Sequence, residues 1–196
     1  MISREYCTGI ILAGGKSSRL GFDKGLLEYR GQTLTERAMK VLGNFCSKLL
    51  ISSNKAEYEK FGVERVADLL EHHGPMMGIY SCLMASPTRH NLVLPVDNIF
   101  VEPSFYEYLI NKLDKSLAAV PYIDNRYFEP LIGYYNKNIL PDMKRMIYKN
   151  NLKLPDLLQE VEVQKLRVEQ DFPAFNDIYF KSINYTEDLV FLENPE

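Results

Sequence analysis

The sequence has no excess of charge of one sign and no long hydrophobic run. Its 196 residues include 23 Lys and Arg against 26 Asp and Glu, which gives a formal net charge of −3. This balance argues against a broad electrostatic surface for nucleic acid or for an anionic membrane. The first apolar run, residues 9–13, is long enough only for a strand and follows no cationic leader. We therefore expect a cytoplasmic protein with no nucleic-acid partner, no membrane partner and no membrane span.

Cysteine and histidine are also scarce. The three cysteines, Cys7, Cys46 and Cys82, are odd in number and far apart, without the close pairs that zinc and redox sites use. They predict buried or reduced thiols. His72 and His73 would point in opposite directions from an extended segment, which favours a loop over a metal-chelating pair.

Two common nucleotide-binding fingerprints are missing. The Walker pattern requires a glycine five residues before Gly15, where this chain has Ile10, and no G-x-G-x-x-G occurs anywhere. A P-loop and a dinucleotide-binding turn are both excluded on spacing.

The composition that is present is that of a globular protein. Hydrophobic residues make up 46% and charged residues 25% of the chain, far from the regime of disordered proteins. The length suits a single domain over residues 1–196. Short β-branched runs alternate with segments of helical period, which predicts an α/β fold with a three-layer, Rossmann-like, mostly parallel sheet and helices on both faces.

The expected elements follow from these periods. Strands are expected over residues 6–12, 48–52, 64–66, 91–96, 117–122 and 131–135. Helices are expected over residues 33–45, 56–61, 103–115 and 139–147, after the Gly and Pro residues of 74–78, and after Thr186. Thr33 and Glu36 have the spacing of a capping box. Residues 57–60 suit an exposed helix face, whereas Met143 and Met146 suit the core.

Several strand ends carry residues suited to a nucleotide. Ligands of open α/β sheets lie at the carboxyl ends of strands, near a switch in strand order. The loop of residues 12–24 combines small residues, which let backbone N–H groups approach an anion, with the cations Arg19 and Lys24. Asp97 ends the clearest strand and suits either Mg²⁺ or a helix N-cap. Asn54 and Asp68 follow two other strands and suit either a guanine pocket or an ordinary turn.

The loop of residues 12–24 resembles the signature L-A-G-G-x-S-x-R-x-G-x-D-K of the molybdenum cofactor guanylyltransferases, a branch of the nucleotidyltransferases with the nucleotide-diphospho-sugar transferase-like fold. Every fixed position of the signature is filled. Later segments are similar too: Gly74-Pro75, Asp97, Pro130-Leu131 on an expected strand, and Ile183-Asn184. The chain departs from the family at Ile99, where proline is usual, at Tyr185 in place of threonine and Thr186 in place of proline, and at Leu20, where methionine is usual.

The resemblance implies a set of site residues. Lys24, Arg19 and Asp97 would be catalytic, with Asp97 holding Mg²⁺, and Asn184 would help to order the acceptor or metal end. Asp23 would be a structural partner of a neighbouring cation or backbone donor. The residues expected to bind the nucleotide are Leu12, Ala13, Gly14, Gly15, Lys24, Asn54, Asp68 and Asp97.

The resemblance also implies a reaction. GMP would pass from GTP to the terminal phosphate of molybdopterin, with or without bound molybdenum, to give the guanine dinucleotide and pyrophosphate. Proteins that deliver and receive the cofactor would be further partners. Two alternatives stay open: a cytidylyltransferase or sugar-phosphate nucleotidyltransferase that shares the phosphate loop, and a non-catalytic nucleotide-binding adaptor, which Ile99 suggests. Leu-Ala-Gly-Gly is the form of the guanine-using members, whereas cytidine-using relatives usually carry Leu-Ala-Ala-Gly.

Overall fold

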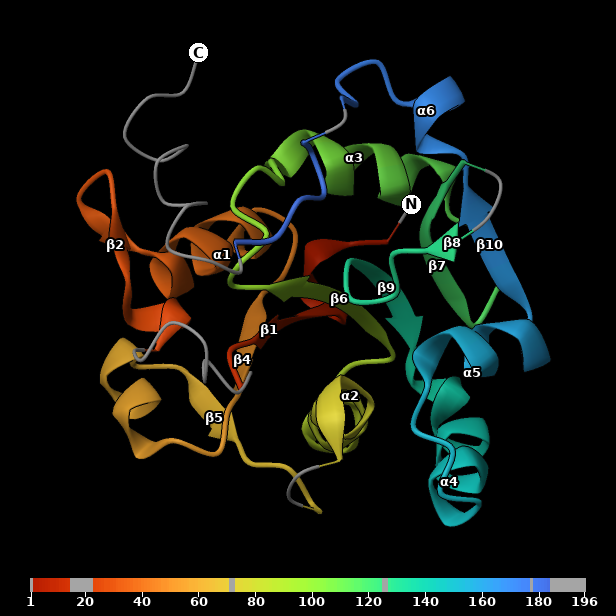
Figure 1. Ribbon diagram of the computed structural model, residues 1–196, viewed down its shortest axis with the longest axis horizontal. Helices are drawn as coiled ribbons and strands as arrows, with labels where there is room; N and C mark the ends of the chain where they lie inside the picture. The colour runs from red at the N-terminus through yellow and green to blue at the C-terminus, as the bar shows by residue number, and fades with distance from the viewer. Residues whose placement is uncertain (1, 15–22, 71–72, 125–126, 177, 184–196) are drawn as a thin grey trace.

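The computed structural model describes residues 2–14, 23–70, 73–124, 127–176 and 178–183. Its main sheet has the strand order β10-β7-β9-β6-β1-β4-β5, with β8 paired to β7 (Figure 1). Neighbouring strands are parallel except at β9, which is antiparallel to β6 and β7, and at the β7–β8 pair. The strands are β1 (Cys7–Leu12), β4 (Lys48–Ser52), β5 (Glu64–Val66), β6 (His90–Pro95), β7 (Ala118–Ile123), β8 (Tyr127–Phe128), β9 (Gly133–Asn136) and β10 (Val163–Leu166).

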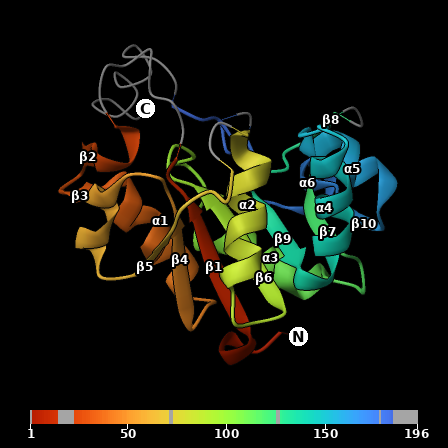
Figure 2. The ribbon, with the colours of Figure 1, turned by 90° about the horizontal axis from the view of Figure 1, so that it is seen from below.

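Helices cover both faces of this sheet, which confirms the predicted three-layer α/β fold. Figures 1 and 2 show α1 and α3 on one face and α2, α4 and α5 on the other. A short hairpin, β2 (Glu28–Tyr29) and β3 (Gln32–Thr33), precedes α1. The helices are α1 (Leu34–Gly43), α2 (Gly74–Ala85), α3 (Pro103–Lys112), α4 (Leu140–Tyr148), α5 (Leu154–Glu160) and α6 (Val168–Asp171). Short 3₁₀ turns are η1 (Arg4–Tyr6), η2 (Lys24–Leu26), η3 (Ala56–Phe61) and η4 (Lys137–Ile139).

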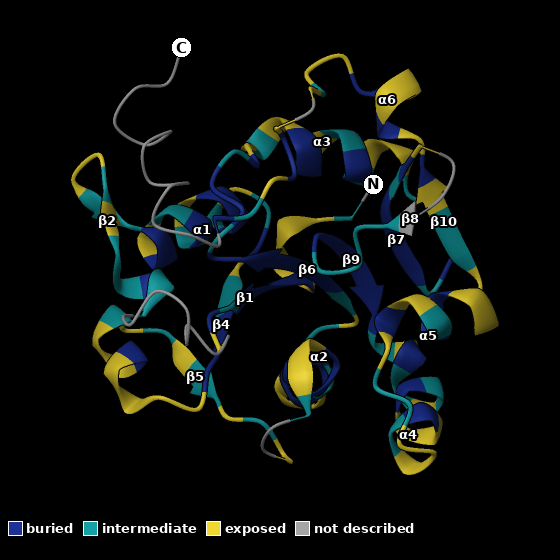
Figure 3. Ribbon diagram, in the orientation of Figure 1, coloured by how far each residue is buried: buried dark blue, intermediate teal, exposed yellow. Residues whose placement is uncertain are grey.

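Each face of the sheet has its own apolar core, because successive side chains of a strand point to opposite faces. In β6, Leu92 and Leu94 join the core under α1 and α3, whereas Val93 joins the core under α2 and α4. Figure 3 shows the buried central strands and the exposed outer sides of the helices. The predicted core residues Met143 and Met146 are buried in the second of these cores. Within the described residues, no helix has the length and apolar character needed to cross a membrane.

The first helix forms where its capping signal predicts. The Glu36 N–H donates to Thr33 Oγ1 at 3.2 Å, and the Thr33 N–H donates to Glu36 Oε2 at 2.7 Å. This reciprocal pair satisfies backbone donors that a helix start leaves without partners. Cys7, Cys46 and Cys82 are free and buried, as expected.

Other elements differ from the expectation. Helix α2 includes residues 74–78, because Pro75 lies in the first turn, where its missing N–H has no intrahelical role. Helix α3 ends at Lys112, and β9 begins at Gly133, so Pro130 and Leu131 lie in the preceding turn. The hairpin, α5, β10 and α6 were not predicted. His72 and the helix expected after Thr186 lie outside the described residues.

Candidate active site

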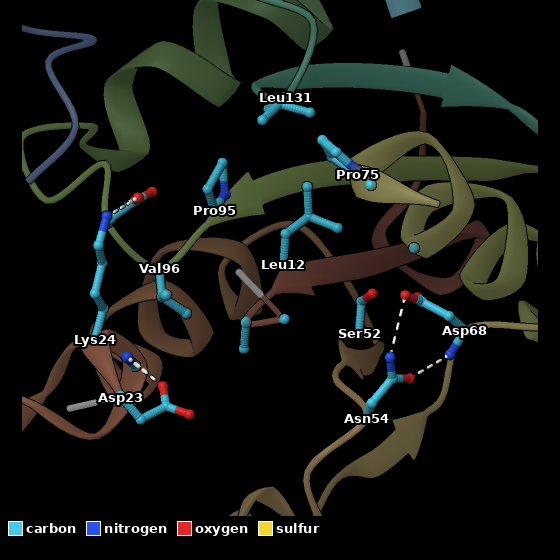
Figure 4. A pocket seen from close by; sticks show the side chains of 16 residues that line it. Leu12, Asp23, Lys24, Ser52, Asn54, Asp68, Pro75, Pro95, Val96 and Leu131 are labelled. Carbon is cyan, nitrogen blue, oxygen red and sulfur yellow. Dashed lines mark hydrogen bonds and ion pairs between the residues drawn. The ribbon is translucent and has the colours of Figure 1, made fainter. Parts of the chain in front are cut away.

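A cavity of 440 Å³ opens at the carboxyl ends of β1, β4 and β6. It lies where the strand order switches, because the chain runs outward from β1 to β4 and β5 and then returns to place β6 on the other side of β1. Seven of the predicted residues line it together (Figure 4): Leu12, Ala13, Gly14, Lys24, Asn54, Asp68 and Asp97. The predicted residues Gly15, Arg19 and Asn184 lie outside the described part of the chain.

The main chain of the first loop is held between the neighbouring strand ends. The Ala13 N–H donates to the Ser52 carbonyl at 3.0 Å, and the Val96 N–H donates to the Leu12 carbonyl at 3.1 Å. These bonds extend the parallel ladders of β1 beyond its last residue. They bring the loop after β1 and the loop after β6 to the same side of the cavity.

A lysine–aspartate ion pair joins these two loops. Lys24 Nζ lies 3.1 Å from Asp97 Oδ2, and the two side chains are 17% and 23% exposed. The Asp97 carbonyl also accepts the Ile183 N–H at 3.0 Å. A partly buried cation and carboxylate therefore meet at the cavity wall, where both are accessible to a charged ligand.

Asp23 fixes the turn that presents Lys24. Its Oδ1 accepts the Gly25 N–H at 3.1 Å and the Tyr58 hydroxyl at 2.5 Å, and its Oδ2 accepts Lys55 Nζ at 2.7 Å. These contacts confirm the expectation that Asp23 pairs with a cation and a backbone donor. Thr35 adds a bond of 2.7 Å from Oγ1 to the Gly25 carbonyl.

The expected exposure of residues 57–60 is wrong at Tyr58. Residues 57–60 were predicted to form an exposed face, but the Tyr58 side chain is fully buried beneath Gly25. Burial and its bond to Asp23 raise the pKa of the phenol well above its ordinary value, so the hydroxyl remains a donor to Asp23. No local pattern points to this contact, because it joins residues 35 positions apart.

Asn54 and Asp68 form the opposite wall. The Asp68 N–H donates to Asn54 Oδ1 at 2.8 Å, and Asn54 Nδ2 donates to Asp68 Oδ2 at 3.3 Å. Gly78 of α2 lies against them: a Cβ at this position would be 2.6 Å from Ser52 Oγ and 3.5 Å from Asp68 Oδ1. The missing side chain lets α2 approach the carboxylate closely.

Two further residues bear on the loop after β6. Ile99 is buried, and its carbonyl accepts Arg37 Nε at 2.6 Å, so packing and a cation hold this loop although the family's usual proline is missing. Glu129 was not predicted as a site residue. Burial and the charge of Asp97 raise the pKa of the Glu129 carboxyl, which places a second acidic group within electrostatic range of Asp97.

The carboxylates of the cavity are the candidate ligands of a metal ion. Within the described ranges, no three His, Cys, Asp or Glu side chains come together to hold one. Asp97 offers hard oxygen atoms at the cavity wall, which fits Mg²⁺ because this ion usually takes one or two protein carboxylates and completes its shell with phosphate oxygens and water. The residues present therefore suit a metal ion bound together with a nucleotide.

Comparison with known proteins gives consistent matches. The sequence pattern of the family described as the MobA-like NTP transferase domain matches residues 9–165. A probable molybdenum cofactor guanylyltransferase of Flavobacterium johnsoniae is 31% identical, over 94% of this chain and 95% of its own. One from Pyrococcus horikoshii is 33% identical, over 91% of this chain and 95% of its own.

Solved structures agree with these matches. The crystal structure of a molybdopterin-guanine dinucleotide biosynthesis protein A from Archaeoglobus fulgidus superposes with a TM-score of 0.78 and 26% identity, covering 95% of this chain and 96% of that one. A 4-diphosphocytidyl-2C-methyl-D-erythritol synthase from Anaerococcus prevotii has a TM-score of 0.68 at 14% identity, with coverage of 96% and 94%. The second match concerns the fold alone.

Proposed function

This chain belongs to the MobA-like NTP transferase family, and from that membership we propose that it transfers GMP from GTP to the terminal phosphate of molybdopterin. The products are molybdopterin guanine dinucleotide and pyrophosphate. The protein is a nucleotidyltransferase, and the choice of base and acceptor is the proposed part. The names of its relatives support that choice. We take residues 1–196 as one catalytic domain.

The observation that carries the proposal is the arrangement of one cavity with two chemically different walls. The Lys24–Asp97 pair suits the triphosphate, and the Asn54–Asp68 pair suits the base. The guanine edge presents N1–H and N2–H donors, which carbonyl or carboxylate oxygens accept. Asp68 supplies such a carboxylate, and Asn54 holds it in place.

The residues of the cavity account for the chemistry of transfer. An oxygen of the acceptor phosphate attacks the α-phosphorus of GTP, and the bond from that phosphorus to the pyrophosphate oxygen breaks. The nucleophile is already ionised at neutral pH, so the step needs no general base. Lys24 offsets charge on the phosphoryl oxygens, and the loop of residues 12–14 offers backbone donors. A Mg²⁺ ion on Asp97 would supply Lewis-acid neutralisation of the phosphates.

Three predicted residues complete the proposal from outside the described part of the chain. Gly15 would join the backbone donors, Arg19 would face the leaving pyrophosphate, and Asn184 would order the acceptor or metal end. The partner proteins that deliver and receive the cofactor also stay predictions.

A pyrophosphate-release assay tests base, acceptor and catalysis together. GTP, CTP and ATP are each combined with molybdopterin, with Mo-molybdopterin and with sugar phosphates, with and without Mg²⁺. We expect release only with GTP, Mg²⁺ and a molybdopterin acceptor. Turnover with CTP or with a sugar phosphate would assign a sibling transferase activity. GTP binding without any release would assign the adaptor role.

A further inference from the structure

A second cavity, of 390 Å³, lies beside the candidate active site. Its walls come from the end of β7, the turn before β9, α6 and the segment that follows α6, as represented by Ile123, Glu129, Glu169, Phe175, Phe180 and Lys181. In Figure 1 that last segment runs from α6 back over α3 towards the middle of the sheet.

The two cavities share one edge of the sheet. Strands β1, β6, β7 and β10 all point the same way, because β9 is antiparallel to both β6 and β7, and β10 is parallel to β7. Their carboxyl ends therefore meet at one edge. The active-site cavity lies over the ends of β1, β4 and β6, and the second cavity lies at the end of β7, on the far side of β9 in the strand order.

Hydrogen bonds tie the wall of the second cavity to the loop of Asp97. Asn98 Nδ2 donates to the Phe180 carbonyl at 2.7 Å, and the Ile183 N–H donates to the Asp97 carbonyl at 3.0 Å. On the other side, Glu129 lines the second cavity and Leu131 lines the active site. A ligand in the second cavity therefore has its nearer end close to Asp97.

The walls of the second cavity combine two phenylalanine rings with the carboxylate of Glu129. The rings of Phe175 and Phe180 have centroids 5.9 Å apart and are tilted by 36°. The Glu129 side chain is half-buried in the wall of this cavity, and within the described ranges no side chain or backbone group donates a hydrogen bond to its carboxylate. Glu169, by contrast, accepts the Asp124 N–H at 3.1 Å. A carboxylate on the wall of a cavity accepts hydrogen bonds from whatever occupies it, so Glu129 suits a ligand that brings N–H groups.

We propose that the second cavity binds the fused heteroaromatic ring of the acceptor, with Glu129 accepting hydrogen bonds from adjacent N–H groups on the ring edge and with the phosphate of the acceptor directed towards Asp97. The assignment rests on the proposed function. A 2-amino-4-oxo-pteridine has such an edge, and its flat faces suit phenylalanine side chains. The carboxylates of Asp124, Glu129 and Glu169 repel the acceptor phosphate, so the charges also set the direction in which the ligand lies. Lys181 adds one cation to this wall.

The test compares Glu129→Gln with Glu107→Gln, which changes an exposed carboxylate of α3 in the same way. Binding of pterin is followed by its own fluorescence, and binding of GTP by calorimetric titration. For Glu129→Gln we expect pterin affinity to fall and the acceptor KM to rise, each by about tenfold or more, because hydrogen bonds to a charged acceptor are lost. GTP affinity and the kcat at saturating acceptor should stay within about twofold of the wild-type values, as a loss confined to acceptor binding requires. Phe175→Ala, which changes only the apolar wall, should also raise the acceptor KM.

The outcomes separate this inference from the proposed function. If guanylyl transfer occurs and both Glu129→Gln and Phe175→Ala leave the acceptor KM at the wild-type value, the second cavity is not the ring site and the proposed function stands. If pterin binding depends on Glu129 but no nucleotide is transferred to molybdopterin, the cavity assignment stands and the proposed function is wrong. A Glu129→Gln variant that loses GTP affinity as strongly as pterin affinity would also overturn the inference.

Discussion

At the scale of single residues, the Lys24–Asp97 pair combines mutual charge compensation with access to the cavity. Each charge compensates the other at 3.1 Å while both side chains keep some exposure. A pair in this setting contributes little to folding, because partial exposure screens it and desolvation offsets much of the attraction. Under the proposed function its value lies in catalysis, because Lys24 and Asp97 would already lie beside the triphosphate.

Replacing Lys24 by methionine tests that role. We expect kcat for pyrophosphate release to fall by about 100-fold or more, because a fixed cation is lost where charge develops. The melting temperature should change little. Lys48→Met is the matched control: Lys48 pairs with Glu64 at 2.9 Å on an exposed surface, and its loss should leave kcat within about twofold. Equal losses in both variants would contradict the role of Lys24.

Glu129 predicts a pH-dependent stability. Burial and the charge of Asp97 raise the pKa of its carboxyl above the ordinary value of 4.5. Its contribution to stability is therefore complete below the unfolded pKa and is lost as the pH rises through the folded pKa. Because Gln stays neutral, Glu129→Gln should melt at a higher temperature than the wild type at about pH 7, and the difference should vanish below about pH 4. Thermal melts over this range, with Glu107→Gln as the control, check the sign.

At the scale of elements, the sequence patterns predict correctly those features that depend on residues close together in the chain. The capping box of Thr33 and Glu36 and the buried face of α4 are both confirmed. Tyr58 was placed wrongly because its burial depends on Gly25 and Asp23, which no periodicity connects to η3. Seven of the predicted site residues converge as expected, but Glu129 and its cavity depend on how β9 and the segment after α6 pack. The sequence pattern does not encode that packing locally.

Helix α2 offers a test of close packing against the cavity wall that Asn54 and Asp68 form. A Cβ on Gly78 would lie 2.6 Å from Ser52 Oγ, so Gly78→Ala should push the helix away from Asp68. We expect GTP affinity to fall by about fivefold or more, since overpacking costs about 1–3 kcal/mol. In Gly43→Ala, at the end of α1, the new Cβ would meet no atom within 4 Å, and stability should rise by about 0.5 kcal/mol. Calorimetric titration with GTP measures the affinity of both variants, and thermal melts measure their stability. Unchanged GTP affinity in Gly78→Ala would count against this packing.

At the scale of the whole molecule, the segment after α6 returns to the loop after β6 and forms hydrogen bonds with it. Asn98 is buried, and its Nδ2 donates to the Phe180 carbonyl across 82 positions of sequence. Asn98→Ala should therefore lower the free energy of unfolding by about 1–3 kcal/mol, because a buried carbonyl loses its donor. Amide hydrogen exchange should accelerate over residues 178–183. Asn44→Ala, which removes an exposed bond of 2.8 Å to the Lys40 carbonyl, should leave that exchange unchanged.

Strand β9 runs antiparallel to its two neighbours, and this direction bears on which segments can be exchanged between relatives of this chain. Because β9 lies between β6 and β7 with its first residue at the active edge, the turn that carries Glu129 is anchored to strands other than β1 and β4. The strand ends under the candidate active site and the turn that carries Glu129 thus belong to different segments of the chain. If both proposals hold, an exchange of residues 124–132 between relatives would change the acceptor while the strands under the proposed GTP site keep their register.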